Sequence, residues 1–483
     1  DSKWYHLYCS VQRCNSALRV LNAATDEQVN GRVSRIAEMK VLRAHYYFEL
    51  SRLFNKIPYF DENVEISQYP DIPNNEFTRD EILSMLAKEM LDAAEQLPAS
   101  QPEVGRIHKY IALAYAAKIK LYQAYQQDEI THAVTSINKE LLREVVSLCD
   151  QVTASNRYGL LDDFQGLDLV TNENGKESVF AIQYSMNDGT ESAGRINWSN
   201  LLNSPGGGSP YGGDGFFLPS QDLINAYQTD ANGLPDFNYQ SKSDYSWAVL
   251  NNGVYTLQNT TPNVDPRLDF VVGRPTITWK TYPDKPCEGW VRDKDTYGYN
   301  CAKRFWVSPE SSDMFNGWPW GASQLNWQII RYADILLWKA EALIELNEGN
   351  GLETARDLIN QIRNRARNSA YVKDFNDHSK YAANYLVNPY PADVWNQDYA
   401  RQALRWETRL EKALEGERFF DLVRWGIVET TMNKYITAES DNRIYYANAH
   451  FTGGKDEYYP VPNNQYGFSG GKYVQNPGYA PFN

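Results

Sequence analysis

Two helical segments joined by a short polar break constrain the fold of this chain more than any other feature. From residue 329 apolar side chains recur every three or four positions, and after the break at 347–351 the same spacing resumes. This is the period of an apolar face on an α-helix. The apolar positions are Ala333, Leu336, Leu337, Ala340, Leu343 and Ile344, followed by Leu352, Ala355, Leu358, Ile359, Ile362 and Ala366. The pattern predicts an antiparallel helical hairpin.

Two further apolar stripes with helical spacing lie nearer the start of the chain. They run through Ala37, Val41, Ala44 and Phe48, and through Ala112, Tyr115, Ala116, Ile119 and Tyr122. Repeated helix-turn-helix units of roughly 34 residues are typical of tetratricopeptide arrays, in which each unit buries its apolar face only against its neighbours. The predicted fold class is therefore mainly α, with a tetratricopeptide-like scaffold of helical hairpins.

The centre of the chain has a different composition. Between residues 172 and 326, Gly, Pro, Asn, Ser and aromatic residues dominate, as in SPGGGSPYGGDGFFLP and NGWPWGAS. Backbone with this composition turns often, which predicts an irregular insertion of loops, short helices and a few hairpins. Because binding sites are commonly built from variable loops on a rigid scaffold, we expect the ligand to bind here.

No Ser/Pro-rich linker or charge block divides the chain, although a length of 483 residues would allow about three domains. We therefore expect a single large domain over 1–483. Within it we distinguish an N-terminal helical scaffold (1–160), a loop-rich ligand-binding region (161–327), and a C-terminal helical pair with a motif and tail (328–483).

The charge of the chain excludes one class of partner. Its formal net charge is −14 and its isoelectric point is near 5.1, with basic residues dispersed among acidic ones, whereas a nucleic-acid surface needs clustered Lys and Arg. The sequence has no run of about 18 apolar residues, so it predicts no membrane-spanning helix. The chain opens at DSKWYHLY, where no charged-then-apolar targeting segment is present.

Residues 401–426, RQALRWETRLEKALEGERFFDLVRWG, carry a dense charged and aromatic pattern. Its positions are Glu407, Arg409, Glu415, Gly416, Arg418, Phe420, Asp421, Leu422, Arg424 and Trp425. Four other parts of the chain belong to the same family pattern: residues 42–60, 105–122 and 329–366, and the tail sequences YYPVPNNQ and QNPGY. On these residues the chain resembles the SusD/RagB family of outer-membrane nutrient-binding lipoproteins.

The resemblance implies a scaffold of four helical pairs and a role in nutrient capture. Such proteins lie on the extracellular face of the bacterial outer membrane and pass oligosaccharides to a SusC-like TonB-dependent transporter. Members normally carry a signal peptide, a lipid-modified Cys and a further stretch before the first helix, so we expect the lipid anchor to be absent from the sequence at hand. Some relatives, like RagB, bind peptides, and that alternative stays open.

The aromatic residues favour a glycan ligand. The chain has 34 Tyr and 13 Trp against 18 Phe, and Tyr and Trp combine a flat apolar face with a polar group. A sugar ring has matching C–H faces and hydroxyl edges. The candidate ligand-binding residues are Tyr69, Tyr245, Trp247, Trp279, Trp290, Trp318 and Trp320. The alternative for each candidate is that its ring anchors the loop to the scaffold and does not contact ligand. Trp338, Trp406 and Trp425 lie on helical motifs, and we expect them to pack against neighbouring helices. The role of Trp4 is open.

The charged positions of the motifs could form an active centre or bridge the helical hairpins. We favour the bridging role, because these charged residues recur at helix-packing positions. They are Arg43, Arg331, Asp334, Glu341, Arg363, Glu415, Arg418, Asp421 and Arg424. A glycosidase needs a defined carboxylate pair, which cannot be singled out among 61 acidic residues.

The sequence lacks the common catalytic and metal-binding motifs. No HExxH, Cys-x-x-Cys, phosphate-loop or dinucleotide pattern occurs, and no Asp-x-Asp-x-Asp-Gly calcium loop. A GxSxG sequence at 467–471 lacks the strand and helix of a nucleophile elbow. We therefore expect no cofactor, no catalytic residues and a non-enzymatic binding protein. A helical-barrel glycoside hydrolase is the alternative from another class.

Five cysteines are too few for a disulfide scaffold. Cys9 and Cys14 are five positions apart on a predicted helix and point away from each other. A bridge between Cys287 and Cys301 would add roughly 3 kcal/mol of stability, and two unpaired thiols are the equal alternative.

Overall fold

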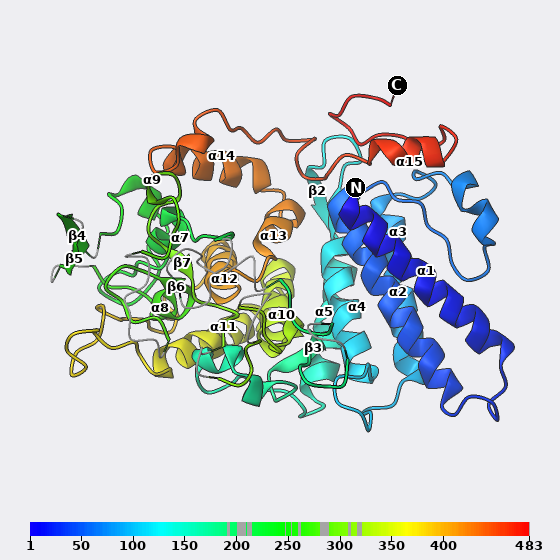
Figure 1. Cartoon of the computed structure of the whole chain (residues 1–483), viewed down its shortest axis with the longest axis horizontal. Helices are drawn as coiled ribbons and strands as arrows, with labels where there is room; N and C mark the ends of the chain where they lie inside the picture. The colour runs from blue at the N-terminus through cyan, green and yellow to red at the C-terminus, as the bar shows by residue number, and fades with distance from the viewer. Residues whose placement is uncertain are drawn as a thin grey trace.

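The computed structural model is mainly helical (Figure 1). The residues it describes are 1–190, 194–199, 209, 215–246, 248–252, 254–258, 262–280, 289–307, 311–315 and 321–482. Trp247, Trp318, Trp320 and Cys287 lie outside the described residues.

Long helices form a continuous stack. The N-terminal ones are α1 (Ser2–Ala23), α2 (Arg32–Phe54), α3 (Arg79–Gln96), α4 (Lys109–Ala124) and α5 (Lys139–Thr153). The later ones are α10 (Tyr332–Leu346), α11 (Gly351–Asn368) and α12 (Gln397–Glu411). Along the stack they make four contacting pairs: α1 with α2, α3 with α4, α5 with α10, and α11 with α12. The tetratricopeptide-like scaffold and the α10–α11 hairpin are confirmed.

Local sequence explains why these helices form and pack. Helix α3 begins with a capping box, in which Thr78 and Glu81 satisfy each other's backbone N–H groups. Helix α4 is buried along almost all of its length, and its alanines let α3 and α5 approach from two sides. Trp4 is 2% exposed and packs edge-on against Phe54, so it belongs to the core.

Four two-stranded antiparallel sheets accompany the helices in the described residues. They pair β1 (Tyr125–Gln127) with β2 (Val134–Ile137), β3 (Ser178–Ile182) with β8 (Trp327–Arg331), β4 (Ala248–Asn251) with β5 (Val254–Leu257), and β6 (Val272–Gly273) with β7 (Cys301–Ala302). Because β8 leads directly into α10, the β3–β8 pair brings the two ends of the central insertion together. The insertion therefore interrupts the α5–α10 pair without separating its helices.

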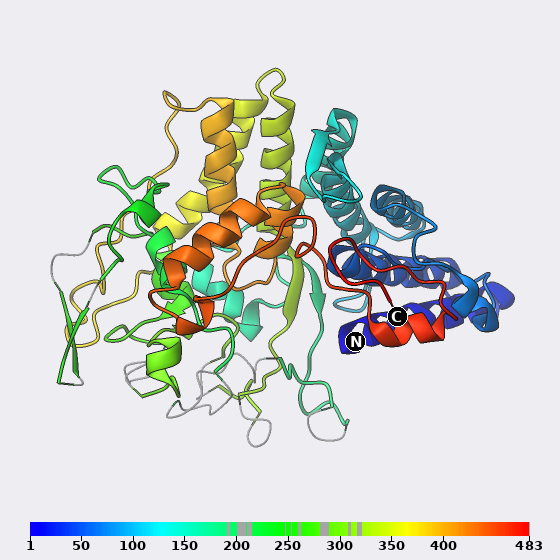
Figure 2. The same cartoon turned by 90° about the horizontal axis from the view of Figure 1, so that it is seen from above.

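Short elements make up most of the insertion and the end of the chain, and one of them, η1, lies between α2 and α3. They are η1 (Ile66–Asp71), η2 (Phe164–Asp168), η3 (Val170–Asn172), α7 (Gln221–Ala226), η4 (Tyr239–Ser241), α8 (Arg267–Val271), α9 (Lys294–Tyr297), α13 (Arg418–Arg424), α14 (Val428–Glu439), η5 (Ile444–Tyr446) and α15 (Asn463–Phe468). The predicted loop-rich composition is confirmed. Figure 2 shows the insertion and the N-terminal helices on opposite sides of α10–α12. Within the described ranges, no helix has the length and apolarity to cross a bilayer.

Candidate functional site

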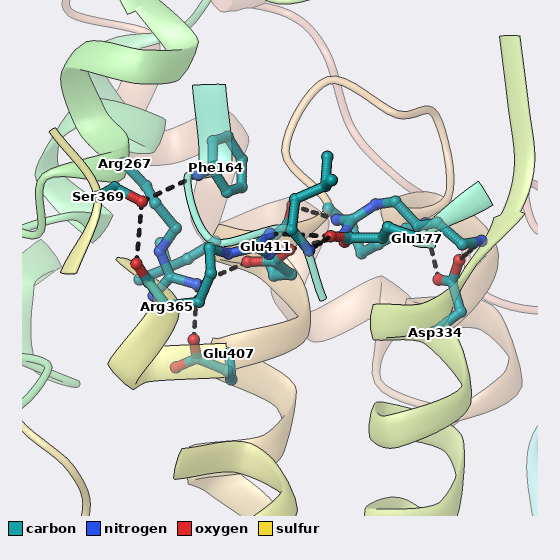
Figure 3. A network of polar contacts seen from close by, with 12 residues as sticks. Phe164, Glu177, Arg267, Asp334, Arg365, Ser369, Glu407 and Glu411 are labelled. Atoms are coloured by element: carbon teal, nitrogen blue, oxygen red, sulfur yellow. Dashed lines mark hydrogen bonds and ion pairs between the residues drawn. The ribbon is translucent and has the colours of Figure 1, made fainter. Parts of the chain in front are cut away.

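A network of buried arginines and carboxylates fastens the insertion to the helical scaffold (Figure 3). At its centre Glu411 of α12 accepts hydrogen bonds from Arg331 (2.6 Å) and Arg267 (3.1 Å) and also pairs with Arg365. Arg331 pairs in addition with Glu177, at 2.9 Å. Burial alone would raise the pKa of Glu411, but the surrounding arginines outweigh it and hold the pKa at about 2. This network is structural rather than catalytic, because each carboxylate is already neutralised.

The predicted packing role of the charged motif residues is confirmed for eight of the nine. Each of these eight forms an ion pair: Arg43, Arg331, Asp334, Glu341, Arg363, Glu415, Asp421 and Arg424. Arg418 is the exception. Its guanidinium forms neither an ion pair nor a hydrogen bond with the part of the chain that the structure describes. The prediction for Arg418 was wrong because a sequence motif does not show whether a carboxylate lies within reach.

Arg418 lines a cavity of about 730 Å³ between α12, α13, α14 and residues 220–240 of the insertion. This volume lies within the range of about 300 to 1,000 Å³ that is usual for small-ligand sites. Phe237, Tyr239 and Trp406 form an aromatic part of the lining, with ring centroids of the first two at 5.2 and 5.4 Å from Trp406. Aliphatic residues such as Leu422 and Ile427 and polar ones such as Gln402 and Thr431 line the rest, so the cavity offers both apolar faces and hydrogen-bonding groups.

Two of the arginines in this cavity are neutralised by the protein itself. Arg409 donates to the carboxylate of Asp222 at 2.6 Å and to the hydroxyl of Tyr239 at 2.8 Å. Arg401 is held by Glu345 at 2.7 Å and by Asp398 at 3.0 Å. Both acidic residues of the cavity lining, Asp222 and Asp398, are therefore already engaged.

Two other arginines in the lining are not neutralised. Arg405 stacks on Trp425, with 5.3 Å between its guanidinium carbon and the ring centroid, and forms no ion pair with the described residues. Burial lowers the pKa of Arg405. Burial, together with the nearby charge of Arg409, lowers the pKa of Arg418 to about 9. Both groups stay protonated at neutral pH, so the cavity contains positive charge that no carboxylate of the described residues meets in an ion pair; Glu341 and Asp421 act on it only from a greater distance.

A row of four tyrosines leads from the cavity to the surface. We call Tyr435, Tyr446, Tyr445 and Tyr297 the tyrosine track. Tyr435 lines the cavity, and successive ring centroids along the track lie 5.5, 4.6 and 6.0 Å apart. Tyr445 and Tyr297 are 51% and 44% exposed. The track thus extends the cavity by an aromatic surface long enough to contact an extended ligand.

The four predicted ligand-binding aromatics that the structure describes are all buried. Tyr69 is 7% exposed and stacks on Phe60 at 3.8 Å. Trp279 and Trp290 are 0% and 4% exposed and pack edge to face at 5.6 Å, and Tyr245 is 2% exposed. These rings fill the interior instead of forming open platforms, because each pins its loop to the fold. The assignment of Trp247, Trp318 and Trp320 stays a prediction.

The helical tryptophans have two different roles. Trp338 and Trp425 are buried as predicted, and the indole of Trp425 donates to Glu341 at 2.8 Å. Trp406, which was also expected to pack, is only half-buried at the cavity wall, where its indole donates to the carbonyl of Ala226. Sequence reasoning also missed Tyr445 and Tyr446. Two adjacent tyrosines in the polar loop DNRIYYANAH were the available signal.

A second cavity, of about 550 Å³, lies beside η2 in the insertion. Its cations have partners: Arg304 pairs with Asp168 at 3.1 Å and Glu415 at 3.2 Å, and Lys303 donates to two backbone carbonyls. The larger cavity is therefore the stronger candidate site.

Two other sequence features have structural outcomes. Ser469 of the GxSxG sequence is 1% exposed, and its hydroxyl donates to the carbonyl of Tyr466 in the tail. Ser469 follows the short helix α15 instead of standing between a strand and a helix, and the described residues between α14 and α15 include no strand, so this serine does not lie on a nucleophile elbow. Cys301 is buried, and its pairing with Cys287 stays a prediction.

Comparisons with known proteins agree with this architecture. Residues 176–479 match the model of the SusD family, and residues 1–121 match a model described as "starch-binding associating with outer membrane". A SusD-like protein of Bacteroides ovatus is 22% identical over 443 residues, which are 87% of this chain and 65% of that protein. The chain thus spans less than two thirds of that relative.

Two solved structures share the fold. Surface glycan-binding protein A of Bacteroides fluxus is 21% identical with a TM-score of 0.69, covering 99% of this chain and 85% of the other. A laminarin-binding SusD-like protein is 21% identical with a TM-score of 0.59, at 99% and 86% coverage. Because the first family model spans more than half of the sequence, including every helix that lines the cavity, the chain belongs to the SusD family.

Proposed function

We propose that this protein binds oligosaccharides on the bacterial cell surface for import through a SusC-like TonB-dependent transporter. The observation that carries the proposal is the aromatic-lined cavity with the tyrosine track that leads out of it. Similar proteins are described as surface glycan-binding and laminarin-binding. In this proposal the chain is held at the extracellular face of the outer membrane by a lipid anchor.

The chemistry of the site suits a sugar. Half-exposed rings such as Trp406 and Tyr445 can cover the C–H face of a pyranose. The polar lining, which includes Gln240, Gln402 and Thr431, can hydrogen-bond the hydroxyl groups around the ring edge. A peptide could use the same aromatic surface, so RagB-like peptide binding is the alternative that a binding experiment has to separate.

We expect binding without turnover. Of the two carboxylates in the cavity lining, Asp222 is buried and held by Arg409, and Asp398 is 94% exposed, so the lining does not offer the pair of free, opposed carboxylates that glycoside hydrolysis needs. The test is to titrate the protein against an oligosaccharide array and a matched peptide library, and then to incubate it with the best ligand. Reducing ends should not rise above a buffer control. Release that persists through repurification would contradict the proposal and favour a hydrolase, and peptide binding alone would favour the RagB-like alternative.

The transporter partnership leads to a second expectation. Tagged full-length protein, extracted in mild detergent from native membranes, should copurify with a TonB-dependent transporter. The control is the same tag on an unrelated lipoprotein of the same membrane. Recovery of the full-length protein without any such transporter would contradict this part of the proposal.

A further inference from the structure

We propose that the ligand of the large cavity is an acidic oligosaccharide, with a sugar carboxylate or sulfate bound between Arg405 and Arg418. The inference rests on the proposed function and specifies the chemistry of its ligand. The positions of the two guanidinium groups, the pairing of their neighbours and the surrounding aromatic lining carry it.

Positive charge exceeds negative charge around the cavity. Arg409 and Arg401 form ion pairs with Asp222 and Asp398, whereas Asp421 and Asp222 act on Arg418 from beyond ion-pair distance. Lys434 adds another cation to the lining. In a protein with a net charge of −14, this local excess of positive charge attracts an anion to the cavity.

Burying Arg405 and Arg418 without an ion pair costs free energy. Elsewhere in the described structure, buried arginines such as Arg331 and Arg363 each meet carboxylates. Arg405 and Arg418 are partly withdrawn from water without an ion pair, and burial outweighs the attraction of more distant carboxylates, so the pKa of both is lowered. An anion with two oxygen atoms would supply charge-assisted hydrogen bonds that the protein itself omits.

The helices α12 and α13 place these arginines around one cavity. Arg401, Arg405 and Arg409 recur every four residues, so they share one face of α12. Arg418 begins α13, and both helices line the same cavity. Stacking of Arg405 on Trp425 holds its guanidinium in a defined position. Trp406 lines the same cavity as Arg405 and Arg418, which suits a sugar ring that carries an acidic substituent.

The test compares ligands that differ only in charge. Oligogalacturonate and its methyl ester have the same backbone, and a sulfated oligosaccharide of equal length supplies the other source of anionic oxygen. Calorimetric titration should show that at least one acidic ligand binds the parent protein about ten-fold or more tightly than the ester, as expected for charge-assisted bonds. A preference between the two acids then identifies the carboxylate or the sulfate.

Arg405→Gln and Arg418→Gln should each weaken binding of that acidic ligand about ten-fold or more and leave the much weaker ester binding within about two-fold. Arg418→Gln should melt at or slightly above the temperature of the parent, because burial without an ion pair costs free energy, whereas Arg405→Gln also loses the contact with Trp425 and should melt slightly lower. Both should stay folded at the temperature of the titration. Arg13→Gln is the matched control, since Arg13 is an exposed arginine of α1, outside the cavity lining. It removes the same charge and should leave both affinities unchanged.

Two results would overturn the inference. One is equal binding of acidic and neutral ligands by the parent; the other is unchanged acid binding in both glutamine variants. In either case a protein that still binds neutral glycans on the array keeps the proposed function. Failure to bind any glycan, with the fold intact, would instead contradict the proposed function itself.

Discussion

Replacement of Arg331 by methionine is expected to lower the free energy of unfolding by about 3 to 5 kcal/mol, the range for breaking a buried ion pair. Arg331 is 1% exposed and contacts the carboxylates of Glu177, Glu411 and Glu415. In the variant these three carboxylates stay buried but lose one of the cations that they share. Since β8 carries Arg331 and Glu411 lies on α12, the loss weakens the attachment of the insertion to the scaffold.

Arg143→Met is the matched control for this variant. Arg143 also forms ion pairs, with Glu140 and Glu348, but its side chain is 43% exposed. Surface pairs of this kind contribute about 0 to 1 kcal/mol. Urea unfolding of the parent and both variants gives the comparison. An Arg331→Met variant no less stable than Arg143→Met would show that the buried network does not hold the fold together.

The same experiment has a pH signature. The pKa of Glu411 is held at about 2, below its ordinary value of 4.5, so its ion pairs stabilise the folded parent fully above pH 4.5. That contribution declines as the pH falls from about 4.5 toward 2. The stability gap between the parent and Arg331→Met should therefore narrow on acidification. A gap that stays constant over this range would indicate lost packing rather than lost charge pairing.

The helical scaffold could be predicted from sequence because its signal is local. Apolar residues at helical spacing, such as Leu336, Ala340 and Leu343, report one buried face whatever the rest of the chain does. The structure adds what local pattern cannot contain. The α5–α10 pair joins helices separated by the whole insertion, and the β3–β8 pairing that makes this possible depends on contacts between residues distant in sequence.

The candidate site was less predictable, for two physical reasons. Trp279 and Trp406 are chemically alike, and only the three-dimensional packing decides that the first is 0% exposed and the second lines a cavity. Arg418 and Arg424 likewise belong to one motif, yet Arg424 forms an ion pair with Glu341 and Arg418 forms none within the described structure. Burial and pairing depend on long-range geometry, which composition and spacing do not encode.

Removal of a tyrosine from the track is expected to have the largest effect on ligand binding. We expect Tyr445→Ala or Tyr446→Ala to reduce the binding free energy by about 2 kcal/mol or more, as for aromatic hot spots. Tyr445 is 51% exposed, so its truncation removes contact surface rather than core packing, and the free energy of unfolding of Tyr445→Ala should change by no more than about 0.5 kcal/mol. Tyr446 is half-buried and hydrogen-bonded to Tyr435, so Tyr446→Ala should be the less stable of the two variants.

In the proposed function, the large cavity and the tyrosine track together form the oligosaccharide site. The most direct test is calorimetric titration of the best array ligand into the parent, Tyr445→Ala, Tyr446→Ala and Tyr5→Ala. Tyr5, on α1, is 62% exposed and serves as the matched control. We predict parent-like affinity for Tyr5→Ala and a loss of about 30-fold or more for the two track variants. Parent-like binding by both track variants, with loss of binding in Trp247→Ala or Trp320→Ala, would contradict the claim and place the site in the loops instead.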